Sequence, residues 1–84
     1  MAQSTRNSQE VEKGAHQSRL LRLMLEANLR IQDNEIGREF WWGYLKGLSR
    51  QYHGQHYGAA IHEHLLRSED SMGRGYREGL SQRV

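Results

Sequence analysis

Apolar residues recur at helical spacing along most of the chain, beginning near residue 16. Between residues 16 and 31 they form a stripe at the i, i+4, i+7 and i+11 positions, which predicts an amphipathic helix. This stripe consists of Leu20, Met24, Ala27 and Ile31. Leu21, Leu23 and Leu25 widen the apolar arc beyond what a surface helix needs. We therefore expect this helix to be central in the fold or shared with a second copy, and we predict a homodimer. A single-chain mass in light scattering would contradict the dimer.

A second apolar pattern predicts a helix that ends near His53-Gly54, where the glycine suits a left-handed C-terminal cap. Asp33 or Asn34 can serve as its N-cap, and Glu35 then lies in the first turn, where a carboxylate is favourable. Neither glycine nor proline interrupts residues 32–34. One long kinked helix is therefore the alternative to two separate helices.

Two shorter helices are predicted beyond a connection at residues 55–58. The first covers about residues 59–67, and Ser68 is then a candidate N-cap for a last helix over residues 69–82. The last helix contains three glycines, so it is weak alone and must pack against its neighbours. Because the chain has no proline and its apolar spacing is helical almost everywhere, we predict an all-α bundle of three to four helices with a flexible N-terminal tail.

A seven-residue phrase occurs twice, as Gly43-Tyr44-Leu45-Lys46-Gly47-Leu48-Ser49 and as Gly75-Tyr76-Arg77-Glu78-Gly79-Leu80-Ser81. Each copy lies in a predicted helix, where a glycine costs roughly 1 kcal/mol relative to alanine. Two glycines four residues apart open a shallow groove on a helix face. Close packing between helices is therefore predicted at Gly43, Gly47, Gly75 and Gly79. Binding of a partner helix or a ligand in one groove is the alternative. A helical-repeat protein is disfavoured, because the copies barely match outside the phrase.

The first fourteen residues are polar and nearly free of large apolar groups. We predict a disordered tail over residues 1–14 and one helical domain over residues 15–84. The tail has no apolar central run and is not expected to be a signal peptide. No apolar stretch approaches the about 20 residues that span a bilayer. The absence of cysteine fits a reducing compartment, so we expect a cytoplasmic protein without a membrane segment.

An aromatic block at residues 40–44 is the strongest candidate for recognition. Phe40, Trp41 and Trp42 span about 200° of a helix, so they cannot all face one core. Trp42 lies off both apolar stripes, and we expect its ring to be partly exposed; burial by the tail or by the last helix is the alternative. An exposed tryptophan beside arginine is typical of binding hot spots. The predicted contact surface for a partner consists of Trp41, Trp42, Tyr44, Arg38 and Arg50.

The net charge is only +2, but ten of the twelve basic residues are arginines. A guanidinium group binds carboxylates and phosphates in a forked geometry, which makes direct nucleic-acid binding an alternative function. If the polar faces of the first and last helices were adjacent, their arginines would form one positive surface. These arginines are Arg19, Arg22, Arg30, Arg74 and Arg77. Ordinary solubilising charge, paired with nearby carboxylates, is the competing interpretation.

Four histidines fall within twelve residues and raise the question of a zinc site. They are His53, His56, His62 and His64. The first two straddle a helix end, and the last two point to opposite faces of a helix. A solvated, pH-sensitive patch is therefore preferred over a histidine metal-binding module. We expect no cofactor. No serine lies on a nucleophile elbow, and the carboxylates fit structural positions, so we expect no enzyme.

A longer string resembles a phrase in small uncharacterised proteins of bacteria and their mobile elements. It reads Trp42-Gly43-Tyr44-Leu45-Lys46-Gly47-Leu48-Ser49-Arg50-Gln51-Tyr52-His53-Gly54, followed by Gly58 and Gly75-Tyr76. Small phage accessory proteins, including inhibitors of CRISPR surveillance complexes, are similar in length and in lacking enzyme motifs. The resemblance implies a stoichiometric binding protein and carries over no catalytic residue. We therefore favour a non-enzymatic helical protein that engages, and in one form inhibits, a larger protein or ribonucleoprotein.

Overall fold

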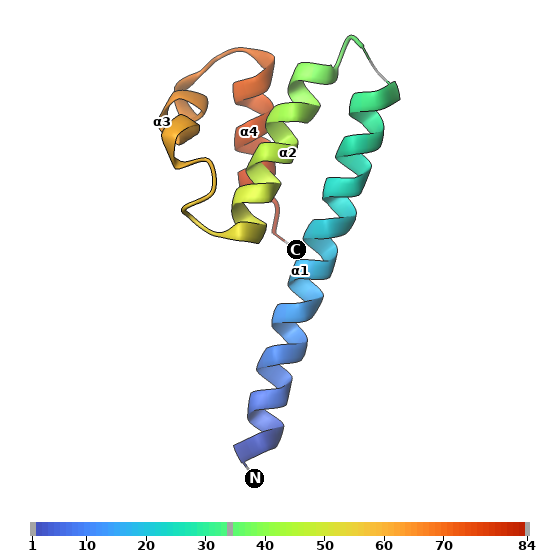
Figure 1. Cartoon of the computed structure of the whole chain (residues 1–84), viewed down its shortest axis with the longest axis vertical. Coiled ribbons are helices and arrows are strands. Elements are labelled where there is room, and N and C mark those ends of the chain that lie inside the picture. Colours follow the sequence, from blue (N-terminus) through green and yellow to red (C-terminus); the bar gives the residue numbers. More distant parts are fainter. Residues whose placement is uncertain (1, 34, 84) are drawn as a thin grey trace.

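The computed structural model describes the backbone of residues 2–33 and 35–83 and, within these ranges, the side chains from residue 14 onward. This part of the chain is all-α and contains no strand, so the predicted fold class is confirmed. Its four helices are α1 (Ala2–Asp33), α2 (Arg38–His53), α3 (Ala59–Arg67) and α4 (Ser71–Ser81). α2 lies between α1 and α4, and α3 packs on α4 (Figure 1). The molecule measures 53 × 28 × 16 Å because α1 extends well beyond the other helices.

α1 begins earlier than the apolar pattern predicts, since it runs without a break from Ala2 rather than from about residue 16. Its first part projects beyond the bundle (Figure 1). This part includes the segment for which we predicted a disordered tail, and the described backbone there is helical. The segment contains no proline, and its one glycine, Gly14, costs only roughly 1 kcal/mol in a helix interior. Among the side chains described from residue 14 onward, Leu20 is the first that is fully buried.

α1 and α2 are separate helices, so the alternative of one kinked helix is wrong. The turn lies later than predicted, because α1 continues through Asp33 and α2 has Gly37 at its N-cap position. Asp33 is therefore not the N-cap, and Asn34 lies outside the described residues. The turn is held by Arg38, whose Nε donates a hydrogen bond to the Ile31 carbonyl at 3.1 Å. A long side chain that reaches back across a turn leaves no local signal in the sequence.

Glycines mark the two reversals between α2 and α3. α2 ends at Gly54 as predicted, and the Gly54 N–H donates to the Arg50 carbonyl at 2.9 Å. The φ of 104° at Gly54 favours glycine, but with a ψ of 175° the residue does not adopt the left-handed helical conformation that we predicted for the cap. Gly58, with a φ of 66°, lies at the N-cap position of α3. These reversals send α3 back along the bundle, so that α4 then runs parallel to α2 (Figure 1).

The boundaries of α3 are as predicted, whereas the start of α4 is not. The N-cap of α4 is Asp70 rather than Ser68: the Asp70 carboxylate accepts a hydrogen bond from the Gly73 amide at 2.8 Å. The Ser68 N–H instead donates to the His64 carbonyl at 3.0 Å and closes α3. Serine and aspartate both cap helices well, so the choice depends on where α3 ends.

The main core lies between α1 and α2. Leu20, Ala27 and Leu48 are fully buried, and Tyr44 joins them at 8 % exposure. A second apolar contact joins α3 to α4 through buried side chains of both helices. Only one side of the wide apolar arc of α1 is covered. The remaining leucines of this arc, Leu21, Leu25 and Leu29, stay exposed.

α2 and α4 contact each other backbone to backbone at the repeat glycines. A β-carbon added at Gly43 would lie 2.8 Å from the carbonyl carbon of Met72, and one at Gly75 would lie 2.8 Å from that of Phe40. Phe40 precedes Gly43 by three residues, as Met72 precedes Gly75. Each glycine therefore contacts the residue three positions before the corresponding glycine of the other copy. The second glycine of each copy meets the opposite helix in the same way one turn later. Each copy of the repeat therefore packs against the other.

Candidate binding groove on α2

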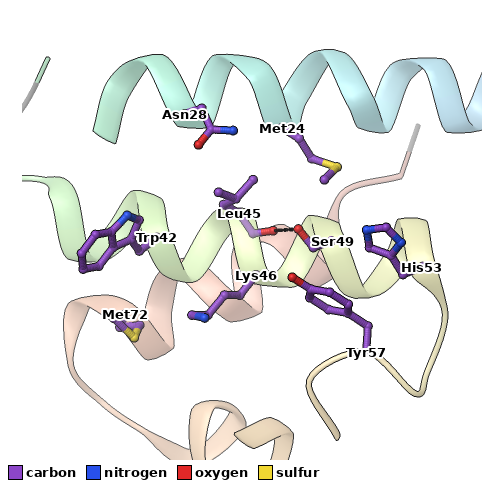
Figure 2. Close-up of a pocket in the computed structure, with 9 residues that line it drawn as sticks. All are labelled: Met24, Asn28, Trp42, Leu45, Lys46, Ser49, His53, Tyr57 and Met72. Carbon is purple, nitrogen blue, oxygen red and sulfur yellow. Dashed lines mark hydrogen bonds between the residues drawn. The ribbon is translucent and has the colours of Figure 1, made fainter. Parts of the chain in front are cut away.

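Three faces of α2 have three different surroundings. The face that contains Gly43 and Gly47 contacts α4. The face that contains Trp41 and Leu48 packs against α1. Because successive helical residues are about 100° apart, Trp42 falls on neither face. The third face lines a groove, which we call the α2 groove (Figure 2).

The α2 groove has a volume of about 610 Å³ and takes its walls from distant parts of the chain. α1 supplies Met24 and Asn28, which point toward α2, and Leu45 lies below them (Figure 2). The connection between α2 and α3 supplies Tyr57, and the first turn of α4 supplies Met72. Most of this lining is apolar, so an apolar group that enters the groove gains contact and loses water.

Three polar residues of the groove lining belong to α2, and α1 adds the amide of Asn28. Lys46 and His53 are exposed side chains of its lining. Ser49 also lines it but is buried, and its hydroxyl donates to the Leu45 carbonyl at 2.7 Å. The serine is thereby satisfied within the helix, which leaves the lysine and the histidine as the groups of α2 that can meet a charged ligand.

The wall that contains Tyr57 is attached to α2 by two contacts. The Tyr57 ring stacks on His53 with centroids 4.8 Å apart, and its carbonyl accepts a hydrogen bond from Arg50 Nη1 at 3.0 Å. Sequence reasoning missed Tyr57, because a residue between two glycines gives no indication of which surface its ring covers. The two contacts bring its ring to the groove across from α1 (Figure 2).

The five predicted contact residues do not form one exposed surface. Trp42 is 45 % exposed and lines the groove, which confirms the prediction that its ring is partly exposed. Trp41 packs against the α1–α2 core, and Arg30 lies over its ring at 4.8 Å from the centroid. Tyr44 is buried, and burial, followed by the charges of Glu78 and Glu26, raises the pKa of its phenol. Of the three aromatic residues predicted to contact a partner, only Trp42 lines the groove.

Arg38 and Arg50 also have structural contacts, since they donate to the carbonyls of Ile31 and Tyr57. Arg77 ends α3 in the same manner: its Nη1 donates to the carbonyls of Leu66 at 3.1 Å and Ser68 at 2.6 Å. A guanidinium group that satisfies backbone oxygens is less available to bind phosphate.

The remaining arginines of the predicted nucleic-acid surface are exposed. They are Arg19, Arg22, Arg30 and Arg74. The first three belong to α1 and the last to α4, and α2 lies between these helices (Figure 1). The polar faces of the first and last helices are therefore not adjacent, which was the condition for one positive surface.

The histidines have separate surroundings. Nδ1 of His62 lies 2.6 Å from the Tyr76 hydroxyl, His53 stacks on Tyr57, and His56 and His64 are exposed. Among the described side chains, those of residues 14–33 and 35–83, no group of three histidine, aspartate or glutamate residues could hold a metal ion. Within residues 2–33 and 35–83, no helix has the length and apolar character needed to cross a membrane.

Comparisons with known protein families, with curated proteins and with solved structures find no match to this chain. A functional assignment therefore depends on the groove and on the side chains around it.

Proposed function

We propose that this chain is a non-enzymatic protein that binds a larger protein or ribonucleoprotein. Inhibition of that partner is one proposed consequence of binding. We place it in the cytoplasm and among the accessory proteins of phages and mobile elements, whose CRISPR inhibitors it resembles in size. The observation that carries the proposal is Trp42, a half-exposed tryptophan in an apolar groove. Tryptophan is among the residues that most often dominate the binding energy of an interface, especially where it lies in a pocket from which the partner excludes water.

The surroundings of Trp42 support an interface. Tyr57 of the lining is 45 % exposed. Leu21 and Leu25, which lie beyond Met24 around the same side of α1 by helical spacing, are 43 % and 65 % exposed. Single exposed apolar residues are common on soluble proteins, but a contiguous apolar surface with a polar edge is typical of a protein contact site. The other predicted contact residues stabilise the fold around Trp42: Trp41 and Tyr44 pack in the core, and Arg38 and Arg50 bind backbone carbonyls.

Direct nucleic-acid binding gains no support from the position of the arginines, because several of them bind backbone carbonyls and the rest are divided between α1 and α4. A salt titration with labelled DNA and RNA addresses this alternative. Phosphate contacts would make the affinity fall steeply as salt rises. The proposed protein contact predicts no such binding at low salt.

The proposal is tested by Trp42→Ala, with Ile36→Ala as the matched control. Ile36 is an equally apolar side chain that is fully exposed in the turn before α2 and does not line the groove. Tagged wild-type protein and both variants are used to capture partners from lysate, and the retained proteins are quantified by mass spectrometry. We expect a retained partner to be lost with Trp42→Ala and kept with Ile36→Ala.

Stability is measured beside capture, because a loss of fold would also abolish binding. Trp42 is about half buried, so its truncation should cost about 1–2 kcal/mol, less than the about 3–5 kcal/mol typical of a fully buried tryptophan. A partner that binds Trp42→Ala as well as wild type would refute the proposed site. A stability loss in the range of a core residue would assign Trp42 to the core instead.

A further inference from the structure

We propose that the occupant of the α2 groove is an amphipathic helix of the partner protein, with carboxylates along the edge that faces Lys46 and His53. This inference rests on the function proposed above, since it names the part of the partner that the groove receives. Three properties of the groove support it: its length, its flexible apolar walls and the sign of its charges.

The length of the groove suits a short helix. On α2 the lining extends from Trp42 to His53, and at 1.5 Å per residue this corresponds to roughly 16 Å, or about three helical turns. The groove is partly open to solvent, so an elongated ligand can lie in it without threading through the fold. A compact small molecule would instead be favoured by a site that encloses most of its surface.

The apolar walls of the groove are adaptable. Met24 extends from α1 and Met72 comes from the first turn of α4, so one flexible thioether belongs to each flanking helix. Methionine fills irregular space and is common in surfaces that receive the apolar face of a helix. Beyond Met24, Leu21 and Leu25 lie further around the same side of α1 and are exposed. They enlarge the surface that the apolar face of a bound helix can cover.

The charges of the groove favour an acidic ligand. Its lining contains the ammonium group of Lys46 and the imidazole of His53. Arg50 lies outside the lining, and its guanidinium donates to the Tyr57 carbonyl. The nine lining residues, all within the described part of the chain, include no carboxylate. The nearest acidic residue on α2 is Glu39, three residues before Trp42 and outside the lining. Among the nine lining residues Lys46 is therefore the one formally charged side chain, and it complements carboxylates of a bound helix.

The test uses two stapled helical peptides of about four turns. Both carry leucines at i, i+3 and i+7 spacing; the acidic peptide has glutamates beside this stripe, and the basic peptide has lysines at the same positions. Affinity is measured by fluorescence anisotropy at low and physiological salt. The protein variants are Lys46→Glu, Trp42→Ala and, as the matched charge reversal outside the groove, Arg83→Glu beyond the end of α4.

We expect wild type to bind the acidic peptide at least about five-fold more tightly than the basic one, since close charge pairs at an interface contribute on this scale. Lys46→Glu should reverse this preference. Trp42→Ala should weaken both peptides, and Arg83→Glu should leave both affinities as in wild type. Equal affinity for the two peptides, no binding of either, or a preference that Lys46→Glu does not change would overturn the inference.

The remaining outcomes separate this inference from the proposed function. If Trp42→Ala loses a captured partner while the peptides fail to discriminate, the acidic helix is wrong and the binding protein stands. If Trp42→Ala retains the captured partner as well as wild type does, the proposed site is wrong. Light scattering tests the other occupant: a wild-type dimer that Trp42→Ala converts to a monomer would show that a second copy fills the groove and would overturn the inference.

Discussion

Replacing Gly75 with alanine tests whether the contact between α2 and α4 holds the bundle together. The added β-carbon would lie 2.8 Å from both the carbonyl carbon of Phe40 and the amide nitrogen of Tyr44, and closer still to the Phe40 carbonyl oxygen. These atoms are main chain, so no side chain can rotate away. A separation of roughly 0.7 Å would relieve only the two 2.8 Å contacts, and the closer carbonyl oxygen requires a larger one. A gap of even about 0.5–1 Å forfeits a quarter to a half of the dispersion energy of the atoms that face it.

The expected cost follows from two opposing effects. Overpacking costs about 1–3 kcal/mol in a typical core, and a main-chain collision should exceed that range, whereas alanine regains about 1 kcal/mol of helix propensity. We expect Gly75→Ala to lower the free energy of unfolding by about 2–4 kcal/mol. A domain of this size has only about 4–13 kcal/mol in total, so the unfolded population would rise at least about thirty-fold.

Urea denaturation followed by far-UV circular dichroism measures the change. Gly43→Ala provides a second test, because its β-carbon would meet Met72 as that of Gly75 meets Phe40, and the two variants should lose similar stability. Gly14→Ala is the control, because nothing lies within 4 Å of its β-carbon and the alanine should be neutral or stabilising. A Gly75→Ala protein as stable as wild type would refute the close approach of the two backbones.

Substitutions at two further positions test how the helix ends are held. The Gln51 amide donates to the carbonyls of Gly79 at 2.6 Å and Gln82 at 3.0 Å, so Gln51→Ala should cost about 1–2 kcal/mol in urea denaturation, and Gln51→Glu at least as much, because a carboxylate cannot donate. The pKa of Asp70 lies below its ordinary value of 3.8, chiefly because the Gly73 amide donates to the carboxylate and then because of the Ser68 side chain. The stability that this cap contributes is therefore fully present above pH 3.8 and is lost as the pH falls through the lower folded pKa. Urea midpoints should show Asp70→Ala to be less stable than wild type near neutral pH, with a difference that shrinks in acid; a difference independent of pH would contradict the role of the carboxylate.

Local patterns in the sequence predict most of the helices but not their junctions. The spacing of apolar residues locates α3, and the glycine chemistry locates the end of α2. The start of α4 differs because Ser68 and Asp70 both have capping side chains, and only the path of the backbone decides between them. The start of α2 differs because α1 continues through Asp33 and Gly37 takes the N-cap position without a side-chain cap, while Arg38 ties the turn to the Ile31 carbonyl. Interactions across a turn carry no periodic signal.

The groove was predictable only in part, for a similar reason. The position of Trp42 off both apolar stripes follows from helical geometry, so its exposure could be predicted from spacing. The structural contacts of Arg38 and Arg50 depend on carbonyl oxygens of other elements, and no pattern within α2 shows them. Tyr57 reaches the groove only because the chain reverses after Gly54 and returns beside His53. Placement of such residues requires the tertiary fold.

The assignment of each face of α2 to a different neighbour limits how this chain can change during evolution. Inserting or deleting one residue between Trp42 and Gly47 would turn the rest of the helix by about 100° and direct a bulky side chain at the α4 backbone. Insertions and deletions should therefore be excluded from α2 and tolerated in residues 54–58, where they would displace Tyr57 from the wall of the groove. A change in the proposed partner would then require exchange of side chains on the groove face, at constant helix length.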